Sequence, residues 1–506
     1  MDTILGIELG STRIKAVTID KEYNVISSGD YTWKSTLENG IWTYSLDEAV
    51  KGVCSALSSI SDLKNIKAAA VSGMMHGYLA FDKDWNLLVP FRTWMNSICE
   101  QAQNILSEAF DFTVPQRWSS SHLFQAILRG EEHVKDVAHI TTIAGYIHHL
   151  LTGENVVGIG EASGMFPIDS ETLDYNAEMI AKYNALCAEK GFEINLSDIL
   201  PRVMKAGENA GYITEEAALL TGLPAGIPLA PPEGDGQTGM TATNSVTPLT
   251  GNVSAGTSIF TMVVLDKDKI KRNPNIVIIM TPDGKPVAMV NANNCTSDMN
   301  AWVGMFCELL ETFGCDVSKN DLFTELYKLS LDGAPDGGGV TVYNFVNGEM
   351  LTHINSGIPM IIRTPDSNLT LSNFIRAQLY STMSTLRLGM DILKEEGIGV
   401  KRLTAHGGLF KTPGVCQKYM ASAYDTAITC LSNAGEGGPY GIALLASYML
   451  WRGENQPLDE YLEKRVFANV ESVTEYPDKN IADGFNAYME RFKAGLCAEK
   501  VAAENM

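Results

Sequence analysis

The chain has 506 residues, of which 45% are hydrophobic and 19% charged, and its formal net charge at pH 7 is −22. One hydrophobic core rarely supports so long a chain, so the length predicts two domains of about 200 to 250 residues each. No apolar stretch reaches the roughly 20 residues of a membrane span, which argues against membrane insertion. The acidic balance argues against nucleic acid as a partner, because phosphates would be repelled.

The cysteines indicate the cellular compartment. Nine of them are scattered along the chain, with no C-x-x-C pair and no histidines at metal-ligand spacing. An odd number at wide spacing argues against a disulfide framework or a structural zinc site and favours a reducing compartment. The first residues carry no basic region ahead of an apolar run, so we expect no export signal. These features together predict a cytoplasmic protein.

Two segments share one layout. Residues 4–19 predict two strands joined by Gly10-Ser11-Thr12, and residues 251–265 predict two strands joined by Gly256-Thr257-Ser258. Such turns are rich in backbone N–H donors, although a single copy is more often purely structural. Because each copy opens one half of the chain, we predict duplicated domains that face a shared ligand, with a boundary near residue 247.

Helices are predicted where apolar residues recur at intervals of three and four. One begins after Ser45, which has capping-box spacing to Glu48. A second follows Ser297, and a third covers residues 375–393. We assign their apolar stripes to the core; the stripe of the second helix comprises Met299, Trp302, Phe306, Leu309 and Phe313.

The strongest local cluster is the stretch from Pro231 to Gly239, which contains Asp235 between two glycines after a predicted strand. A carboxylate in this setting is sterically open to a substrate. Transfer of a phosphoryl group from ATP to an alcohol requires a group that accepts the hydroxyl proton. Asp235 is therefore our candidate base. The alternative is an ordinary Asp-Gly turn, and the motif alone does not decide between the two.

Two glycine-rich turns follow in the second half. His406-Gly407-Gly408 links a short predicted strand to a helix, and residues 433–441 precede an apolar helix. A backbone without side chains can approach a nucleotide closely at such places. Neither turn is a Walker loop or a G-x-G-x-x-G fingerprint, so P-loop and Rossmann interpretations lack their main support. Plain strand-to-helix turns remain the alternative for both.

The order of these motifs resembles the FGGY family of carbohydrate kinases along essentially the whole chain. Ser72-Gly73-Met74-Met75-His76-Gly77 resembles the Ser-Gly-Gln-Met-His-Gly of its xylulokinase branch, and Gly234-Asp235 matches its catalytic Gly-Asp. The remaining matches are residues 4–19 and 251–258 for the two phosphate loops, Gly407-Gly408 with Lys411 and Gln417 for the nucleotide segment, and Glu436 to Ser447 for the closing helix.

The resemblance implies an α/β fold with two ribonuclease-H-like domains of the actin and hexokinase type and an active-site cleft between them. Residues 1–247 would bind the sugar and supply the base, and residues 248–506 would bind the nucleotide. The implied reaction is ATP-dependent phosphorylation of a primary hydroxyl of a small neutral sugar, with Mg²⁺ held by Glu8 and Asp235. The implied sugar contacts are Met75, His76, Trp94, Asn96 and Asp235, and the implied ATP contacts are Gly10, Ser11, Thr12, Lys15, Gly256, Thr257, Gly407, Gly408 and Lys411.

Three departures from the family pattern bear on chemistry. Glu8 stands where the family usually has Asp, and its extra methylene would shift a metal-held water by about 1.5 Å. A carboxylate within an apolar strand is costly to bury without a partner, so we favour a functional role for Glu8. Met74 replaces the expected Gln, and Trp94-Met95-Asn96 stands where Trp-Asn-Asp is common. These changes lie on the sugar side, so the acceptor can differ from the best-known pentuloses.

The histidines are expected to have two different roles. A single histidine beside apolar residues is usually a satisfied core side chain, but His76 lies at a predicted strand end where the resemblance favours sugar binding. His148 and His149 fit a helix without a nearby ligand partner, so we assign them a structural role.

The leading hypothesis is an ATP:ketose phosphotransferase that acts on a pentulose such as xylulose or ribulose. The alternatives are a heptulose or polyol kinase, an actin-like ATP-binding switch that phosphorylates no small molecule, and an impaired relative that binds sugar without turnover. A homodimer is compatible with the sequence.

Overall fold

A computed structural model describes residues 2–267, 270–432 and 437–506. Contacts group the chain into two compact units: unit 1 is Met1–Thr247, Lys267–Val287 and Glu436–Asn469, and unit 2 is Pro248–Asp266, Ala288–Gly435 and Val470–Met506. The chain first leaves unit 1 after Thr247 and later returns to it twice, so each unit combines segments that are far apart in the sequence. Within the described ranges, no helix has the length and apolar character needed to cross a membrane.

Unit 1 is organised around a five-stranded sheet. The strand order is β11 (Glu233–Gly234), β6 (Ile66–Gly73), β1 (Thr3–Leu9), β2 (Arg13–Ile19) and β3 (Val25–Thr32). β1 and β2 form the predicted antiparallel hairpin, in which Glu8 lies opposite Lys15. β6 runs parallel to β1, and β11 runs parallel to β6. Parallel pairing brings the carboxyl ends of β1, β6 and β11 to one edge of the sheet, where Glu8, Met75 and Asp235 follow or end these strands.

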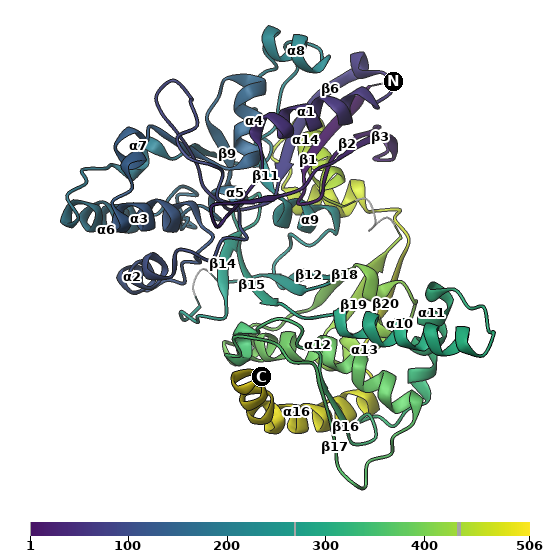
Figure 1. Cartoon of the computed structure of the whole chain (residues 1–506). Coiled ribbons are helices and arrows are strands. Elements are labelled where there is room, and N and C mark those ends of the chain that lie inside the picture. Colours follow the sequence, from purple (N-terminus) through teal and green to yellow (C-terminus); the bar gives the residue numbers. More distant parts are fainter. Residues whose placement is uncertain (1, 268–269, 433–436) are drawn as a thin grey trace. The chain divides into compact units, whose positions relative to one another are not determined.

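Two helices cover this sheet. α14 (Gly437–Trp451) packs against β1, β2 and β6, and α1 (Leu46–Ser58) packs against β2 and β3 (Figure 1). α14 approaches β1 so closely that a Cβ on Gly6 would overlap the carbonyl oxygen of Pro439. Ser45 caps α1 as predicted, because its Oγ accepts a hydrogen bond of 3.2 Å from the N–H of Glu48. Residues 433–436 of the glycine-rich turn before α14 lie outside the described residues.

Unit 1 contains a further set of strands and helices outside this sheet and its two covering helices. His148 lies in one of them, with Nε2 3.0 Å from the carbonyl oxygen of Ala210, which agrees with the structural role assigned to it. These elements are β4 (Thr36–Glu38), β5 (Ile41–Thr43), β7 (Leu79–Phe81), α2 (Glu100–Phe110), α3 (Ser119–Arg129), β8 (His139–Thr141), α4 (Ile143–Thr152), β9 (Val156–Gly158), α5 (Ile159–Ala162), α6 (Ala177–Glu189), α7 (Leu196–Ile199), β10 (Arg202–Met204), α8 (Glu215–Thr221), α9 (Asp235–Ala242), β14 (Val277–Met280) and α15 (Leu458–Tyr461).

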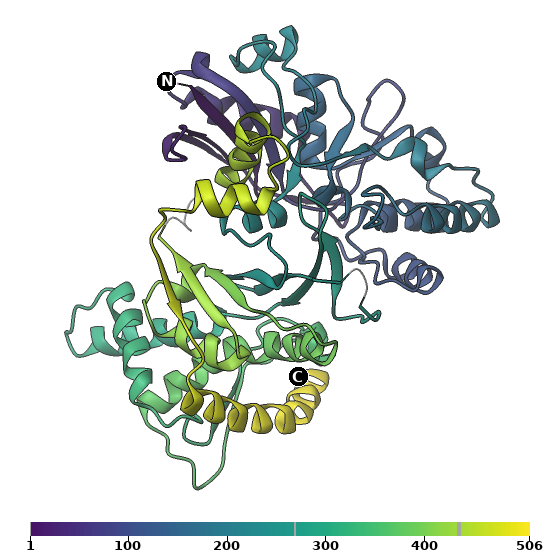
Figure 2. The same cartoon turned by 180° about the vertical axis from the view of Figure 1, so that it is seen from behind.

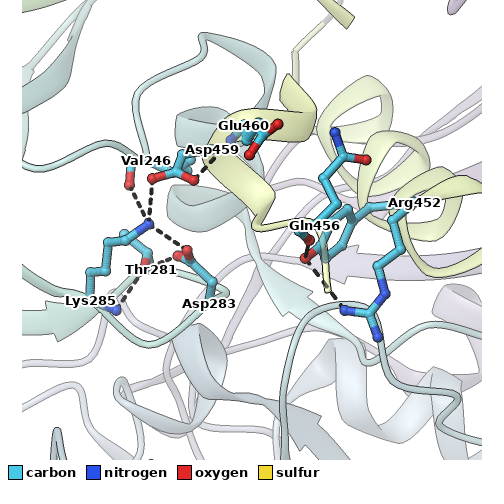
Figure 3. A network of polar contacts seen from close by, with 9 residues as sticks. Val246, Thr281, Asp283, Lys285, Arg452, Gln456, Asp459 and Glu460 are labelled. Carbon is cyan, nitrogen blue, oxygen red and sulfur yellow. Dashed lines mark hydrogen bonds and ion pairs between the residues drawn. The ribbon is translucent and has the colours of Figure 1, made fainter. Parts of the chain in front are cut away.

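Lys285 joins the three separate segments of unit 1 (Figure 3). Its Nζ donates hydrogen bonds to Asp283 Oδ2 at 2.6 Å, to Asp459 Oδ2 at 3.1 Å and to the carbonyl oxygen of Val246 at 3.4 Å. The two carboxylates raise the pKa of Lys285 although burial opposes the charge. The ammonium group therefore stays charged and holds α15 to the turn after β14.

We expect Lys285→Ala to lower the free energy of unfolding of unit 1 by about 2 kcal/mol, because it leaves two half-buried carboxylates without their cation. Lys464→Ala is the matched control, since Lys464 pairs with Glu460 on an exposed helix surface. That control should change stability by less than about 0.5 kcal/mol. Equal effects of the two substitutions in a urea titration would contradict the role given to Lys285.

Unit 2 contains the second hairpin and a larger sheet. Its strands β15 (Pro286–Ala292), β13 (Ile259–Val264), β12 (Thr250–Ala255), β18 (Arg402–His406), β19 (Ala427–Leu431) and β20 (Ser472–Glu475) are neighbours in that order. β12 and β13 form the antiparallel hairpin predicted from the sequence, and β18 lies parallel to β12. The other elements are α10 (Ser297–Thr312), α11 (Lys319–Leu329), β16 (Val340–Tyr343), β17 (Met360–Arg363), α12 (Leu371–Glu395), α13 (Cys416–Tyr424) and α16 (Lys479–Asn505). Of these, α16 packs against α13 and β16 (Figure 2).

The apolar stripes predicted on α12 and α10 differ in how far they are buried. The stripe of α12 is buried along its length, which confirms the prediction. The stripe of α10 is only partly in the core: Met299 is buried, but Leu309 and Phe313 are 55% and 77% exposed, so that part of the prediction is wrong. Helical periodicity shows that side chains share a face, but it does not show whether another element covers that face.

Candidate active site

The predicted sugar-side motif forms a turn after β6. His76 and Gly77 both have a left-handed backbone, with φ of 72° and 95°. The Gly77 N–H donates to the Arg117 carbonyl oxygen at 2.9 Å, and the Ser119 hydroxyl donates to the Gly77 carbonyl oxygen at 2.6 Å. A Cβ on Gly77 would lie 2.8 Å from the carbonyl oxygen of Arg92. A positive φ at a residue other than glycine costs about 1 to 3 kcal/mol and is found most often at functional sites.

Asp235 is the first residue of α9, directly after β11. Its Oδ1 accepts hydrogen bonds from the N–H groups of Met75 at 3.2 Å and Gly236 at 2.9 Å. Burial raises the pKa of Asp235, whereas these two hydrogen bonds and the charge of Arg117 oppose the rise. The structure thus brings Asp235 and Met75 together, and a raised pKa makes the carboxylate a better proton acceptor.

His76, the residue after Met75 in this turn, contributes a neutral imidazole. Its Nδ1 lies 3.0 Å from the carbonyl oxygen of Gly164, and burial, with a smaller effect of the Arg117 charge, holds its pKa well below the ordinary value. A carbonyl oxygen only accepts hydrogen bonds, so Nδ1 carries the proton and Nε2 has a free lone pair. His76 Nε2 can therefore accept a hydrogen bond from a hydroxyl group.

Glu8 lies at the end of β1 with its carboxyl group against the start of α14. A Cβ on Gly438 would overlap Oε1 of Glu8, so glycine at 438 leaves the room that the longer acid needs. Burial and the negative charge of Asp235 raise the pKa of Glu8 to about 7, and the charge of Lys15 opposes them. Glu8 and Asp235 are therefore close enough to affect each other electrostatically.

The two carboxylates fit a magnesium site in part. Mg²⁺ is usually held by one or two carboxylates and completes its octahedron with water and phosphate oxygens. In the part of the chain that the structure describes, no group of three or more His, Cys, Asp or Glu side chains is placed to hold a metal ion. Glu8 and Asp235 thus match the small protein share of a Mg²⁺ shell, and they do not form an all-protein cage.

Two buried acids near Asp235 were not predicted from the sequence. Glu233 accepts hydrogen bonds from the N–H groups of Gly160 at 3.3 Å and Glu161 at 2.7 Å, and burial raises its pKa to about 8. A Cβ on Gly158 or Gly160 would collide with the Glu233 carboxyl group. Glu161 is fully buried, and its Oε2 would lie 2.5 Å from a Cβ on Gly234. The spacing of glycines at 158 and 160 was the available sequence signal, but its partner, Glu233, is more than 70 residues away.

Trp94 and Asn96 are placed differently from the first three sugar-side residues. The Asn96 side chain pairs with the backbone of Trp42: its Oδ1 accepts from the Trp42 N–H, and its Nδ2 donates to the Trp42 carbonyl oxygen, both at 2.8 Å. Trp94 is 42% exposed. Asn96 thereby fixes the loop that carries Trp94, and direct sugar contact by either residue stays a prediction.

The predicted phosphate turns are exposed in both units. In unit 1, Gly10 N–H donates to the Arg13 carbonyl oxygen at 2.9 Å, and the side chains of Ser11 and Thr12 are exposed. In unit 2, Gly256 N–H donates to the Ser258 carbonyl oxygen at 2.9 Å, and Thr257 is exposed. Both turns thus present backbone to solvent at the tip of a hairpin.

The paired glycines after β18 lie beside the second turn. Gly407 has φ of 108°, and a Cβ there would overlap the carbonyl oxygen of Ala255 at the end of β12. Gly408 and Lys411 are exposed next to it. Gln417 is buried and donates its Nε2 to the carbonyl oxygens of Ile428 and Val473, so its side chain ties α13 to strands. The structure thus brings Gly256 and Gly407 together within unit 2.

Glu349 braces the segment that leads to the second turn. Its Oε2 accepts hydrogen bonds from the Asn293 N–H at 2.9 Å and from Asn294 Nδ2 at 3.2 Å. Burial raises its pKa from 4.5 to about 7, against the opposing hydrogen bonds. The folded protein therefore binds this proton more tightly than the unfolded chain.

The raised pKa of Glu349 predicts a pH-dependent stability. The protonated Glu349 carboxyl group contributes to the free energy of unfolding, and this contribution is fully present below about pH 4.5. It is lost as the pH rises through about 7, and the total loss is up to about 3 kcal/mol. Glu349→Gln keeps an oxygen acceptor without a titrating proton. We expect this variant to be more stable than the parent at pH 8.5 and equal to it near pH 5, as measured by thermal melting. Parallel melting curves at every pH would contradict this expectation.

Two α/β units, each with a hairpin of this kind, fit the class of two-domain sugar kinases. The model of the FGGY family of carbohydrate kinases, N-terminal domain, matches residues 3–242, and that of the C-terminal domain matches residues 251–450. This chain belongs to the FGGY family of carbohydrate kinases, and it is a phosphotransferase that uses ATP and a sugar, as the resemblance implied. The predicted two-domain α/β fold is confirmed.

Individual relatives share the whole length of the chain. A xylulose kinase of Haemophilus influenzae is 23% identical over 516 residues, which cover 97% of this chain and 99% of the relative. The crystal structure of a xylulose kinase from Rhodospirillum rubrum superposes with a TM-score of 0.80 at 20% identity and covers 99% of this chain and 100% of that one. A gluconate kinase from Lactobacillus acidophilus has a TM-score of 0.79 at 17% identity and covers 98% and 99%. The fold is thus shared by kinases whose names refer to different acceptors.

Proposed function

We propose that this kinase phosphorylates a primary hydroxyl of a small ketose, with a pentulose such as xylulose or ribulose as the acceptor. One observation carries the proposal: Asp235, directly after β11, accepts a hydrogen bond from the Met75 N–H in the turn after β6, and the same turn carries the neutral His76 side chain. A carboxylate together with an imidazole that can accept a hydrogen bond suits a polyhydroxylated, uncharged substrate. The xylulose kinases among the relatives support the same acceptor class.

The reaction follows from the roles of these groups. Asp235 accepts the proton of the primary hydroxyl while that oxygen forms a bond to the γ-phosphorus of ATP and the bond to the β,γ-bridging oxygen breaks. The Met75 N–H orients the carboxylate, and His76 Nε2 accepts a hydrogen bond from a second hydroxyl. Fixed orientation of both hydroxyls lowers the entropic cost of reaching the transition state.

We further propose that Glu8 and Asp235 would hold Mg²⁺, and that the exposed turns at Gly10-Ser11-Thr12 and Gly256-Thr257 bind the phosphates of ATP. Bound Mg²⁺ would neutralise charge on the phosphates. Lys15, Gly407, Gly408 and Lys411 are assigned to the nucleotide as well. Residues 1–247 would then carry the sugar and the base, and residues 248–506 the nucleotide. The unpaired cysteines support a reducing, cytoplasmic setting.

The test is a coupled ADP-release assay with Mg-ATP against pentuloses, heptuloses, polyols, aldoses and aldonates, with a blank that lacks sugar. A pentulose is expected to raise ADP release well above the blank and above every other class. If a heptulose, polyol or aldonate were preferred, that class would be the acceptor and the proposed pentulose would be wrong. ADP release that no sugar changes would favour an ATP-driven switch, and sugar binding without turnover would favour an impaired relative.

A further inference from the structure

In unit 1, each carbonyl oxygen of the turn Gly10-Ser11-Thr12 accepts a hydrogen bond from a residue packed against the turn. Gly10 O accepts a hydrogen bond from the indole Nε1 of Trp33 at 2.7 Å, and Ser11 O accepts one from the Tyr44 hydroxyl at 2.7 Å. The backbone N–H of Trp33 donates to Thr12 O at 3.2 Å. Three successive carbonyl groups of an exposed turn are therefore fixed by two side chains and one backbone group.

The two side-chain donors in unit 1 pack against each other. Trp33 and Tyr44 are buried, and their ring centroids lie 4.4 Å apart. Aromatic pairs in contact stabilise each other by about 0.5 to 1.5 kcal/mol beyond the area that they bury. Loss of a single donor would therefore leave the ring packing in place and would release only the carbonyl group that it holds.

The turn in unit 2 has the same construction from different residues. The Thr296 hydroxyl donates to Gly256 O at 2.7 Å, and the Thr296 N–H donates to the same oxygen at 3.2 Å. The N–H of Cys295 donates to Thr257 O at 3.0 Å. In both predicted phosphate turns, carbonyl oxygens therefore accept hydrogen bonds from neighbouring residues. The residues that donate these bonds differ in type between the two units.

A held carbonyl group determines the direction of the next N–H. Because a trans peptide is planar, the C=O of one residue and the N–H of the next point in opposite directions. Fixing Gly10, Ser11 and Gly256 therefore turns the N–H groups of Ser11, Thr12 and Thr257 away from Trp33, Tyr44 and Thr296. Among the described residues, none accepts a hydrogen bond from these three N–H groups. They remain available to an anion.

We propose that Trp33, Tyr44 and Thr296 are positioning residues for ATP: they hold the carbonyl groups of the two turns so that the turn N–H groups face the phosphates. The inference rests on the proposed function, because it takes the turns to be phosphate sites. Without these donors a peptide could flip and present a carbonyl oxygen, which repels phosphate, in place of an N–H. None of the three side chains needs to touch the nucleotide.

The experiment compares hydroxyl deletions that are matched in chemistry. Tyr44→Phe removes the hydroxyl that donates to Ser11 O and that also pairs with Ser35. Its control is Tyr448→Phe, which removes a hydroxyl of α14 that donates at 2.6 Å to Gln456 O, beyond the end of that helix. Thr296→Val removes the donor to Gly256 O, and its control is Thr382→Val, which loses a bond of 2.7 Å to Leu379 O within α12. Trp33→Phe is a further variant. The Kd for Mg-ATP without sugar, the KM for the sugar and the melting temperature are measured for each.

We expect Tyr44→Phe and Thr296→Val to weaken ATP binding about fivefold each, the effect of one hydrogen bond, and to leave the KM for the sugar unchanged. The two controls should lower the melting temperature to a similar degree and leave the ATP Kd as in the parent. An ATP Kd that moves no more in Tyr44→Phe and Thr296→Val than in their controls would overturn the positioning role. A parent protein that binds no ATP would instead overturn the proposed function, and the positioning role with it.

Discussion

Asp235→Asn is expected to lower kcat by about 10²- to 10⁴-fold, the usual contribution of a general base, and to leave the Kd for Mg-ATP within about twofold of the parent. Asparagine can still accept the hydrogen bonds from Met75 and Gly236 through its amide oxygen, so the turn should keep its shape. It cannot accept the proton of the sugar hydroxyl. Steady-state kinetics with saturating ATP, together with calorimetric titration of ATP, separate the two quantities.

The matched control for this substitution is Asp62→Asn. Asp62 has a left-handed backbone with φ of 64°, which asparagine also tolerates, and its side chain accepts a hydrogen bond from Asn65 Nδ2. We expect Asp62→Asn to retain the kcat of the parent. If Asp235→Asn also turned over at the parent rate while it bound sugar and ATP normally, Asp235 would not be the base.

Gly438→Ala is expected to have the second large effect. The new Cβ would overlap Glu8 Oε1 and lie 3.2 Å from Thr238 Oγ1, so the Glu8 carboxyl group would have to move. Because Glu8 and Asp235 influence each other's charge, a displaced Glu8 should change the electrostatic environment of Asp235. We expect kcat to fall by about 10²-fold or more, within the range of a disturbed acid-base site.

The double variant Glu8→Asp, Gly438→Ala separates this clash from general damage to α14. Aspartate is shorter by one methylene, about 1.5 Å, and leaves room for the alanine methyl group. We expect the double variant to recover part of the lost rate and Glu8→Asp alone to be slower than the parent, since the site is built around the longer acid. Gly304→Ala, a helical glycine with no atom near its Cβ position, controls for helix propensity. A double variant that is slower than Gly438→Ala would contradict a direct contact between the side chains at positions 8 and 438.

The sequence predicted those parts of the fold and site that depend on local patterns. The hairpins of residues 4–19 and 251–265 were predictable because apolar strands flank a short Gly-Ser/Thr turn, and the structure confirms both. Asp235 was predicted as the base from its glycines and the strand before it; the structure places it directly after β11, within hydrogen-bond distance of the Met75 N–H, and its role as base stays a prediction. These signals lie within ten to twenty residues, where backbone geometry and hydrophobic alternation dominate.

Features that depend on distant partners were not predictable from local patterns. Gly438 is small because Glu8 lies against it, and Gly158 and Gly160 are small because the Glu233 carboxyl group fills the space. Similarly, residues 267–287 and 436–469 pack with the first unit, which no composition change along the chain indicated. Such relations appear only when the tertiary packing is known.

The central claim is tested most directly by the identity of the reaction product. Xylulose or ribulose is incubated with Mg-ATP and the chain, and the sugar is analysed by mass spectrometry, with Asp235→Asn as the parallel sample. The account predicts a sugar that is heavier by one phosphoryl group, esterified at a primary hydroxyl, and formed at least about 10²-fold more slowly in the Asp235→Asn sample. Formation of ADP and free phosphate with the sugar unchanged would contradict it.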